Sequence, residues 1–277
     1  MPDARVRLRF WGVRGSTPTP QVENLIFGGN TSCVEVRTAR NECLIFDAGS
    51  GIRNLGRLLI EEAAGAPIDV KLFLTHFHWD HIQGIPFFAP IYGPQNSVSF
   101  YTGVEGRMLE ETLEGQMAKP YFPVDFGQVA AKRNFNAIAP GGAVDAGGVK
   151  VIPFPLNHPQ KASGYRIEAD GAVIVYATDY EHGDPELDRI LLEYSANADV
   201  LICDAQYTPA EYEKHRGWGH STWLNAVELA RKAGARQLFL FHHDPSHDDQ
   251  QMLKITEQAR KHFENTTCAW EGFTSDF

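Results

Sequence analysis

The sequence predicts an α/β fold in which two mixed β-sheets pack face to face and helices cover their outer surfaces. Short runs that alternate apolar and polar residues occur in blocks of several, as in strands of one sheet. Helical patterns fall singly between these blocks or at the end of the chain. Hydrophobic residues make up 43% of the 277 residues, which is enough to fill a large core. We therefore expect one domain over residues 1–277.

Each element is predicted from its local pattern. Runs rich in β-branched and aromatic residues predict strands at 6–11, 33–38, 44–47, 70–75, 98–102, 149–154, 165–168, 173–178, 200–204, 237–241 and 268–271. Apolar residues at helical spacing predict helices at 52–64, 105–116, 185–194, 222–232 and 248–263. Gly65 and Gly234 predict the ends of the helices at 52–64 and 222–232, and Ser221 is a candidate N-cap of the latter.

The segment 119–148 is rich in proline and glycine and is predicted to be the least regular part of the chain. An ordinary surface excursion is the first expectation. A lid over a site, or a contact between two copies in a homodimer, is the alternative.

Composition narrows the function. A net charge of −10 argues against a partner held by its phosphate backbone, whereas a small anion is allowed because bound metal ions supply positive charge. Residues 1–12 lack the apolar segment of a signal peptide, and no run of about 18 apolar residues occurs, so we expect a cytoplasmic protein with no membrane partner.

The cysteines show no CxxC spacing, and buried free thiols are favoured over zinc ligands or disulfides. These cysteines are Cys33, Cys43, Cys203 and Cys268.

The most informative stretch is THFHWDH, residues 75–81, directly after the apolar run Val70 to Leu74. It contains His76, His78, Asp80 and His81. Imidazole nitrogen and carboxylate oxygen are preferred ligands of Zn²⁺ and related ions, and a strand that ends abruptly lets alternate side chains converge. The motif therefore predicts a metal site rather than a polar surface loop.

Further ligand types follow later strands. His158 follows the strand at 149–154, Asp179 follows the strand at 173–178, and His242 and His243 follow the strand at 237–241. Each alone is typical of a turn or cap. Together with residues 75–81 they supply enough donors for two metal ions. Alternating side-chain direction allows only one of the two adjacent histidines to face the site.

This order of residues resembles the metallo-β-lactamase superfamily, in particular the branch with tRNase Z and the PhnP-type and cyclic-nucleotide phosphodiesterases. The motifs that carry the resemblance are HxHxDH at 76–81, FWG at 10–12, FDAG at 46–49, SGYRI at 163–167 and GHST at 219–222. They span nearly the whole chain. The resemblance implies that the two packed sheets form the αββα sandwich of that superfamily.

By position, the resemblance assigns His76, His78 and His158 to a first metal ion and Asp179 to both ions. It assigns Asp80, His81 and His242 to a second ion. The choice of His242 over His243 rests on its place directly after Leu240-Phe241, like His76 after Leu74-Thr75. Asp47 resembles the aspartate that orients the ligand loop in that family. The implied cofactors are two divalent ions, Zn²⁺ first and Mn²⁺ second.

Asp204 and His220 resemble a pair in tRNase Z, in which the acidic residue orients the histidine and the histidine acts on the leaving group. With Asp80 they form the predicted catalytic set. A carboxylate-supported imidazolium can donate a proton near neutral pH. A hydrogen-bonded histidine in a helix-capping loop is the alternative interpretation.

The resemblance implies a phosphodiesterase that hydrolyses a small phosphodiester, with a cyclic nucleotide first. His158 and Asp179 are only 21 positions apart, which leaves no room for the RNA-binding arm of bacterial tRNase Z. No large nucleic acid is therefore expected as a partner, and a tRNase Z-like 3′ RNA-processing endonuclease is the alternative. A noncatalytic metal-binding regulator remains a rival. A flavodiiron-like redox protein is disfavoured because the length leaves no room for a flavin domain.

Overall fold

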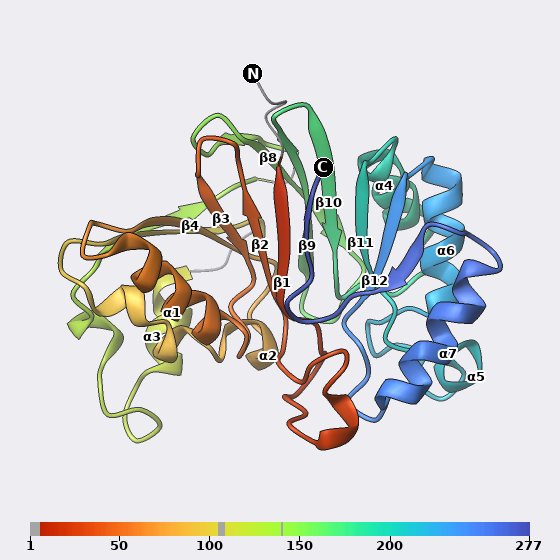
Figure 1. Ribbon diagram of the computed structural model, residues 1–277, viewed down its shortest axis with the longest axis horizontal. Coiled ribbons are helices and arrows are strands. Elements are labelled where there is room, and N and C mark those ends of the chain that lie inside the picture. Colours follow the sequence, from red (N-terminus) through yellow and green to blue (C-terminus); the bar gives the residue numbers. More distant parts are fainter. Residues whose placement is uncertain (1–5, 105–108, 140) are drawn as a thin grey trace.

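Two seven-stranded sheets dominate the computed structural model, which describes residues 6–104, 109–139 and 141–277 (Figure 1). The first sheet has the order β14-β1-β2-β3-β4-β5-β6, and its strands are Thr274–Asp276, Arg7–Gly12, Cys33–Arg37, Cys43–Phe46, Asp69–Leu74, Ser97–Thr102 and Lys132–Ala137. The second sheet has the order β13-β12-β11-β10-β9-β8-β7, and its strands are Thr266–Cys268, Gln237–Phe241, Val200–Asp204, Ala172–Ala177, Ala162–Ala169, Lys150–Leu156 and Val144–Asp145.

The helices lie outside the two sheets. Their bounds are α1 Ile52–Ala63, α2 Trp79–Ile82, α3 Leu109–Gln116, α4 Pro185–Ser195, α5 Pro209–Tyr212, α6 Trp223–Ala233 and α7 Asp249–Arg260. Figure 1 shows α1 and α3 on one side of the paired sheets and α4, α6 and α7 on the other. The predicted α/β sandwich of two mixed sheets is therefore confirmed.

Each sheet is parallel in one half and antiparallel in the other. Strands β3 to β6 are parallel neighbours, and so are β10 to β13. Parallel strands end at the same edge, so the residues that follow β3, β4, β10, β11 and β12 can gather at one end of the sandwich. The short helix α2 lies at this end, in the lower part of Figure 1. This topology places the predicted metal ligands together.

The core between the sheets also supports that end. The rings of Phe46 and Phe73 stack with centroids 5.1 Å apart, and both pack against Tyr165. Tyr165 donates its hydroxyl to the backbone oxygen of Leu74, at the end of β4 (2.6 Å). Buried tyrosines need such partners because an unpaired hydroxyl in a core is costly. The aromatic core thus fixes the strand end that precedes the HxHxDH motif.

Several expectations about single elements need correction. Thr222, not Ser221, is the N-cap of α6: its side chain accepts from the backbone nitrogen of Asn225, whereas Ser221 donates to the oxygen of Tyr180. The helix expected over 105–116 is described only as α3, because 105–108 lie outside the described residues. Ala64, with φ 49°, occupies the left-handed cap of α1 just before Gly65. Gly234 caps α6 as predicted.

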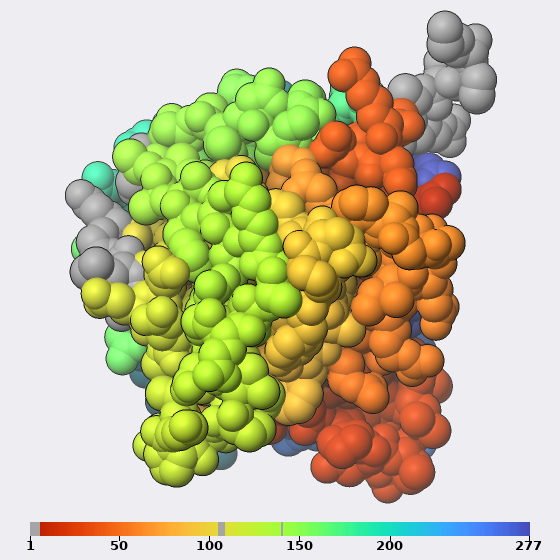
Figure 2. Space-filling view, turned by 90° about the vertical axis from the view of Figure 1, so that its left-hand side faces the viewer, coloured from red at the N-terminus to blue at the C-terminus, as the bar shows by residue number. Residues whose placement is uncertain are grey.

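The segment 119–148 is more regular than expected. It contributes β6 to the edge of the first sheet and β7 to the edge of the second. Figure 2 shows the yellow-green part of this segment on the outer surface of the molecule, on the side of the first sheet. The strand expected at 268–271 also differs, because pairing with β12 ends at Cys268.

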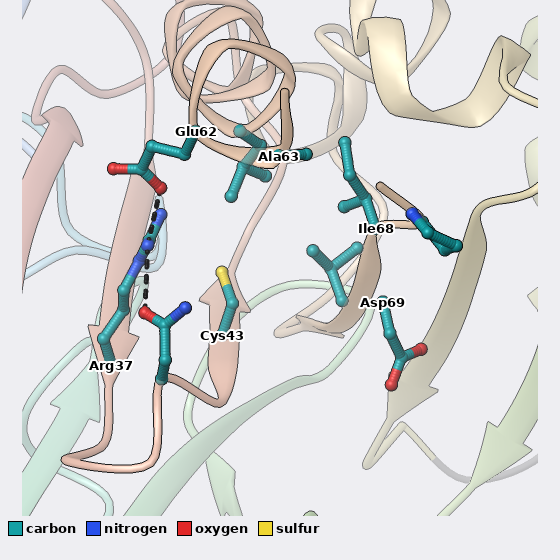
Figure 3. A pocket seen from close by; sticks show the side chains of 10 residues that line it. Arg37, Cys43, Glu62, Ala63, Ile68 and Asp69 are labelled. Atoms are coloured by element: carbon teal, nitrogen blue, oxygen red, sulfur yellow. Dashed lines mark hydrogen bonds and ion pairs between the residues drawn. The ribbon is translucent and has the colours of Figure 1, made fainter. Parts of the chain in front are cut away.

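The four cysteines are buried and free, as predicted. Cys43 lies beside a pocket of about 240 Å³ at the end of α1, where Arg37 pairs with Glu62 and hydrogen-bonds Asn41 (Figure 3). Burial raises the pKa of its thiol, so Cys43 is an unreactive core residue. In the described part of the chain, no helix has both the length and the apolar character needed to cross a membrane.

Candidate metal centre and active site

Three site residues share an uncommon backbone conformation where strands end. Asp47, Asp179 and His242 lie one or two residues after β3, β10 and β12, with φ of 60°, 58° and 59°. Left-handed conformations cost non-glycine residues about 1–3 kcal/mol and concentrate at functional sites. At these strand ends the left-handed turn aims the side chains into the space between the sheets.

One group of side chains consists of Asp80, His81 and His242. The Nε2 atoms of the two histidines are 3.2 Å apart, and Asp80 Oδ2 lies 3.3 Å from His81 Nε2 and 3.2 Å from His242 Nε2. His81 Nδ1 donates to Asp47 Oδ2 (2.8 Å), and His242 Nδ1 donates to Gln206 Oε1 (3.0 Å). Because each outer nitrogen faces an acceptor, both Nε2 atoms are turned toward each other and toward the Asp80 carboxylate. A metal ion between them would bind both nitrogens in place of a proton.

A second group consists of His76, His78 and His158. His158 Nε2 lies 3.2 Å from His78 Nδ1, and His76 Nε2 is buried and has no hydrogen-bond partner among the described residues. The other nitrogen of each ring again faces an acceptor: Thr75 Oγ1 for His76 at 3.0 Å, Gln160 Oε1 for His78 at 3.1 Å and Gly219 O for His158 at 2.9 Å. These contacts also leave three lone pairs pointing inward.

Asp179 lies between the two groups. Its Oδ1 is 3.7 Å from the Nε2 atoms of both His76 and His158, and its Oδ2 is 3.1 Å from His81 Nε2 and 3.3 Å from His242 Nε2. Burial raises the pKa of Asp179, but the imidazoles around it, His242 first, outweigh burial and hold its pKa well below the usual value. The side chain is therefore an anion with one oxygen toward each group.

The donor set fits divalent metal ions. Five imidazole nitrogens and two carboxylates converge on one space, and nitrogen with oxygen donors suits Zn²⁺ and its neighbours. Burial lowers the pKa of His76 and of His158, which favours the neutral form that a metal ion requires. Burial also lowers the pKa of His81, but the adjacent carboxylates, Asp179 first, raise it above its usual value, so an ion would compete with a proton there.

Asp204 and His220 form a buried pair beside both groups. His220 Nδ1 donates to Asp204 Oδ2 (2.9 Å), and Asp204 Oδ1 accepts from the backbone nitrogen of Ser221 (2.8 Å). The His220 ring is stacked 4.9 Å from that of His242 and lies 5.2 Å from that of His158. Burial lowers the pKa of His220, but Asp204 more than offsets this, and the pKa rises to about 9. The imidazole therefore holds a proton at neutral pH.

The structure brings all the predicted site residues together and separates the two adjacent histidines. His242 faces the site, whereas His243 is turned away and donates Nε2 to the backbone oxygen of Ala269 (2.8 Å). Thr222 caps α6 without a contact from Asp204 or His220, and the catalytic role of this pair stays a prediction.

Some supporting residues were not predicted. Gln206 orients His242, Thr75 orients His76, and the backbone nitrogen of Ser16 donates to Asp80 Oδ2 (2.7 Å). Ser16 belongs to the turn after the FWG motif. A Cβ on Gly15 would lie 2.4 Å from the His242 ring, so this glycine lets the turn approach the site. The glycine-rich turn was the available signal for that contact.

Glycine is also needed in the GHST loop. Gly219 has φ 88°, and a Cβ there would lie 2.2 Å from His158 Nδ1. Glu181, two positions after Asp179, accepts from the backbone nitrogens of Gly217 (2.7 Å) and Gly219 (2.8 Å). These contacts position the loop that carries His220.

The fold and the site together define a metal-dependent hydrolase built on two packed sheets. The profile of the family described as "Beta-lactamase superfamily domain" matches residues 43–243, and the chain belongs to that family. The resemblance inferred from the HxHxDH, FDAG and GHST motifs is thereby confirmed.

Relatives and solved structures agree with this assignment. Ribonuclease BN of Cronobacter sakazakii is 25% identical, over 85% of this chain and 90% of its own length. Ribonuclease Z of Streptococcus suis is 27% identical, over 81% of this chain and 86% of its own.

Three solved structures share the fold at 20% identity. YhfI from Bacillus subtilis has a TM-score of 0.76, covering 99% of this chain and 100% of its own. A diphosphatase from the PhnP family has a TM-score of 0.72, and the match covers 99% of this chain and 98% of that one. The short form of human tRNase Z has a TM-score of 0.68, and the match covers 97% of this chain and 98% of that one.

These relatives correct one expectation. The acidic balance and the short spacing between His158 and Asp179 predicted no large nucleic acid partner, yet the relatives include enzymes named as ribonucleases. That expectation was wrong, because whole-chain charge does not describe the field at a metal centre.

Proposed function

We propose that this chain is a phosphodiesterase with two divalent ions, Zn²⁺ first and Mn²⁺ second, and that its substrate is a cyclic nucleotide. The observation that carries the proposal is the Asp204–His220 pair beside two groups of metal-ligand side chains that share Asp179. A protonated histidine next to such a centre suits the departure of an alkoxide, which needs a proton.

One set of residues binds the metal ions, and a second set donates the proton. Asp80, His81 and His242 would hold one ion, His76, His78 and His158 would hold the other, and Asp179 offers one oxygen to each group. Such ions would supply Lewis acidity that polarises a phosphoryl oxygen and lowers the pKa of water. His220 Nε2 faces the substrate and donates a proton to the leaving ribose oxygen. Asp204 fixes the ring and favours its protonated form.

RNA 3′-end processing is the second candidate. It is favoured by the named ribonucleases, which align over more than four fifths of the chain. Both candidates use the same metal centre and the same proton donor, so they differ in what lies beyond the scissile phosphate.

A substrate panel tests the proposal. Purified protein should contain close to two equivalents of Zn²⁺ or Mn²⁺ and hydrolyse bis-p-nitrophenyl phosphate. We expect higher kcat/KM on 3′,5′- or 2′,3′-cyclic nucleotides than on a precursor RNA with a 3′ extension. The reverse order would select the second candidate. Full activity after exhaustive chelation, with metal analysis confirming removal, would refute a metal-dependent mechanism altogether.

A further inference from the structure

A cavity of about 150 Å³ opens beside the candidate metal centre. It is lined by His76, Phe77, His78, Thr112, Gln160 and Lys161. A single water needs only about 10–15 Å³ by this kind of measure, so the cavity can hold a larger polar group. It shares His76 and His78 with the metal-ligand set. A group bound in it would therefore sit next to the scissile phosphate.

Lys161 is the cation among these described lining residues. In the described part of the chain no carboxylate lies within ion-pair distance of its ammonium group, although the protein carries ten more acidic than basic residues. Lys71 and Lys150, by contrast, pair with glutamates. An ammonium group without such a partner, beside the candidate cation site of His76 and His78, would be repelled by a bound ion unless an anion lies between them.

The turn that carries Lys161 is tied to the metal ligands. The backbone nitrogen of Lys161 donates to the oxygen of His158 (3.0 Å), and Gln160 Oε1 accepts from His78 Nε2 (3.1 Å). Gln160 and Lys161 have φ of 63° and 70°, two successive left-handed residues that are not glycine. Such strain persists where the surroundings impose it, often at ligand sites. The turn therefore presents Lys161 at a fixed place beside the centre.

We infer that Lys161 binds a second phosphate of the substrate, next to the diester that is cleaved. The preferred substrates are then nucleotides or polynucleotides that carry a further phosphate near the scissile bond. Charge-assisted hydrogen bonds between an ammonium group and phosphate oxygens supply the recognition. This inference rests on the proposed phosphodiesterase activity and names the substrate class for it.

Two chromogenic diesters that differ by one phosphate test the inference. Thymidine 5′-(p-nitrophenyl phosphate) and its 3′-phosphorylated form share the leaving group and the scissile bond. The wild type should prefer the 3′-phosphorylated form in kcat/KM, and Lys161→Ala should reduce that preference about tenfold, mainly through KM. Lys161→Arg should keep most of it. Lys150→Ala, which removes the same charge from the same hairpin, should leave it unchanged.

A binding measurement separates this inference from the proposed function. Calorimetric titration with thymidine 3′,5′-bisphosphate and with thymidine 5′-monophosphate needs no turnover, and Lys161→Ala should weaken only the former, again about tenfold. If neither diester is cleaved, the proposed function fails, and the titration alone decides the role of Lys161. Absence of a wild-type preference, or equal effects of Lys161→Ala on both members of each pair, would overturn the inference.

Discussion

Replacing His220 with alanine separates a proton donor from a metal ligand or a structural residue. Nδ1 of His220 is committed to Asp204 Oδ2 at 2.9 Å, and the carboxylate raises the pKa of the buried ring to about 9. A group with a pKa near 9 is mostly protonated at neutral pH. A positioned donor contributes roughly 10²–10⁴-fold to the rate, so we expect His220→Ala to lower kcat on a cyclic nucleotide by that factor.

The assay compares two leaving groups at one metal centre. The ribose oxygen of a cyclic nucleotide needs a proton as it departs, whereas the nitrophenolate of bis-p-nitrophenyl phosphate does not. The loss for His220→Ala should therefore shrink strongly on the activated ester while metal content stays at the wild-type level. His262 is exposed and its ring lies near that of Trp223, so His262→Ala is a control that should change neither rate.

The pH profile gives a second readout. The protonated ring is the active form, so the rate on a cyclic nucleotide should fall as the pH rises through the pKa of His220. Asp204 raises that pKa, hence Asp204→Asn should move the fall to lower pH. Equal losses on both substrates, or loss of metal from His220→Ala, would show that His220 is a ligand or a structural residue.

Two further changes test the ligand assignments. Asp179→Ala should abolish turnover and weaken the binding of both ions, because the two oxygens of Asp179 face different imidazole groups at 3.1–3.7 Å. A variant with two tightly bound ions and a near-normal rate would show that another residue contacts both ions. His242→Ala should lower metal content, whereas His243→Ala should keep it and lower the free energy of unfolding by about 1–3 kcal/mol, since the buried carbonyl of Ala269 loses its donor. Metal analysis and thermal unfolding distinguish the two, and the opposite pattern would show that His243 is the ligand.

The central strands could be predicted from the sequence because burial on one or both faces leaves a clear apolar pattern. The bounds of β11 and β12, Val200–Asp204 and Gln237–Phe241, coincide with those expected. The edge strands β6 and β14 could not be predicted. Their sequences, KRNFNA and TSD, are mostly polar and are held by pairing with β5 and β1. Strand formation at a sheet edge follows from the neighbour more than from propensity.

The ligand types and their strand-end positions could also be predicted, but their orienting partners could not. Side-chain alternation shows that only one of His242 and His243 can face inward, without saying which, and His242 leaves the strand conformation altogether with φ 59°. Gln206 and Tyr176 support the site through contacts with His242 and Asp47, and the latter contact joins residues 129 positions apart. No local pattern contains such a contact.

The expectation that no large nucleic acid binds was wrong because it was drawn from the net charge of the whole chain. The net charge of −10 belongs to the whole chain, whereas binding responds to the potential within about a Debye length, roughly 8 Å at physiological ionic strength. Within the candidate centre, Asp80 and Asp179 are surrounded by five imidazoles that are suited to holding cations. Lys161 adds a positive group at the edge of the same space. Exposed acidic residues elsewhere are screened from that space, so an acidic protein can still present a local anion-binding site to a phosphodiester of any length.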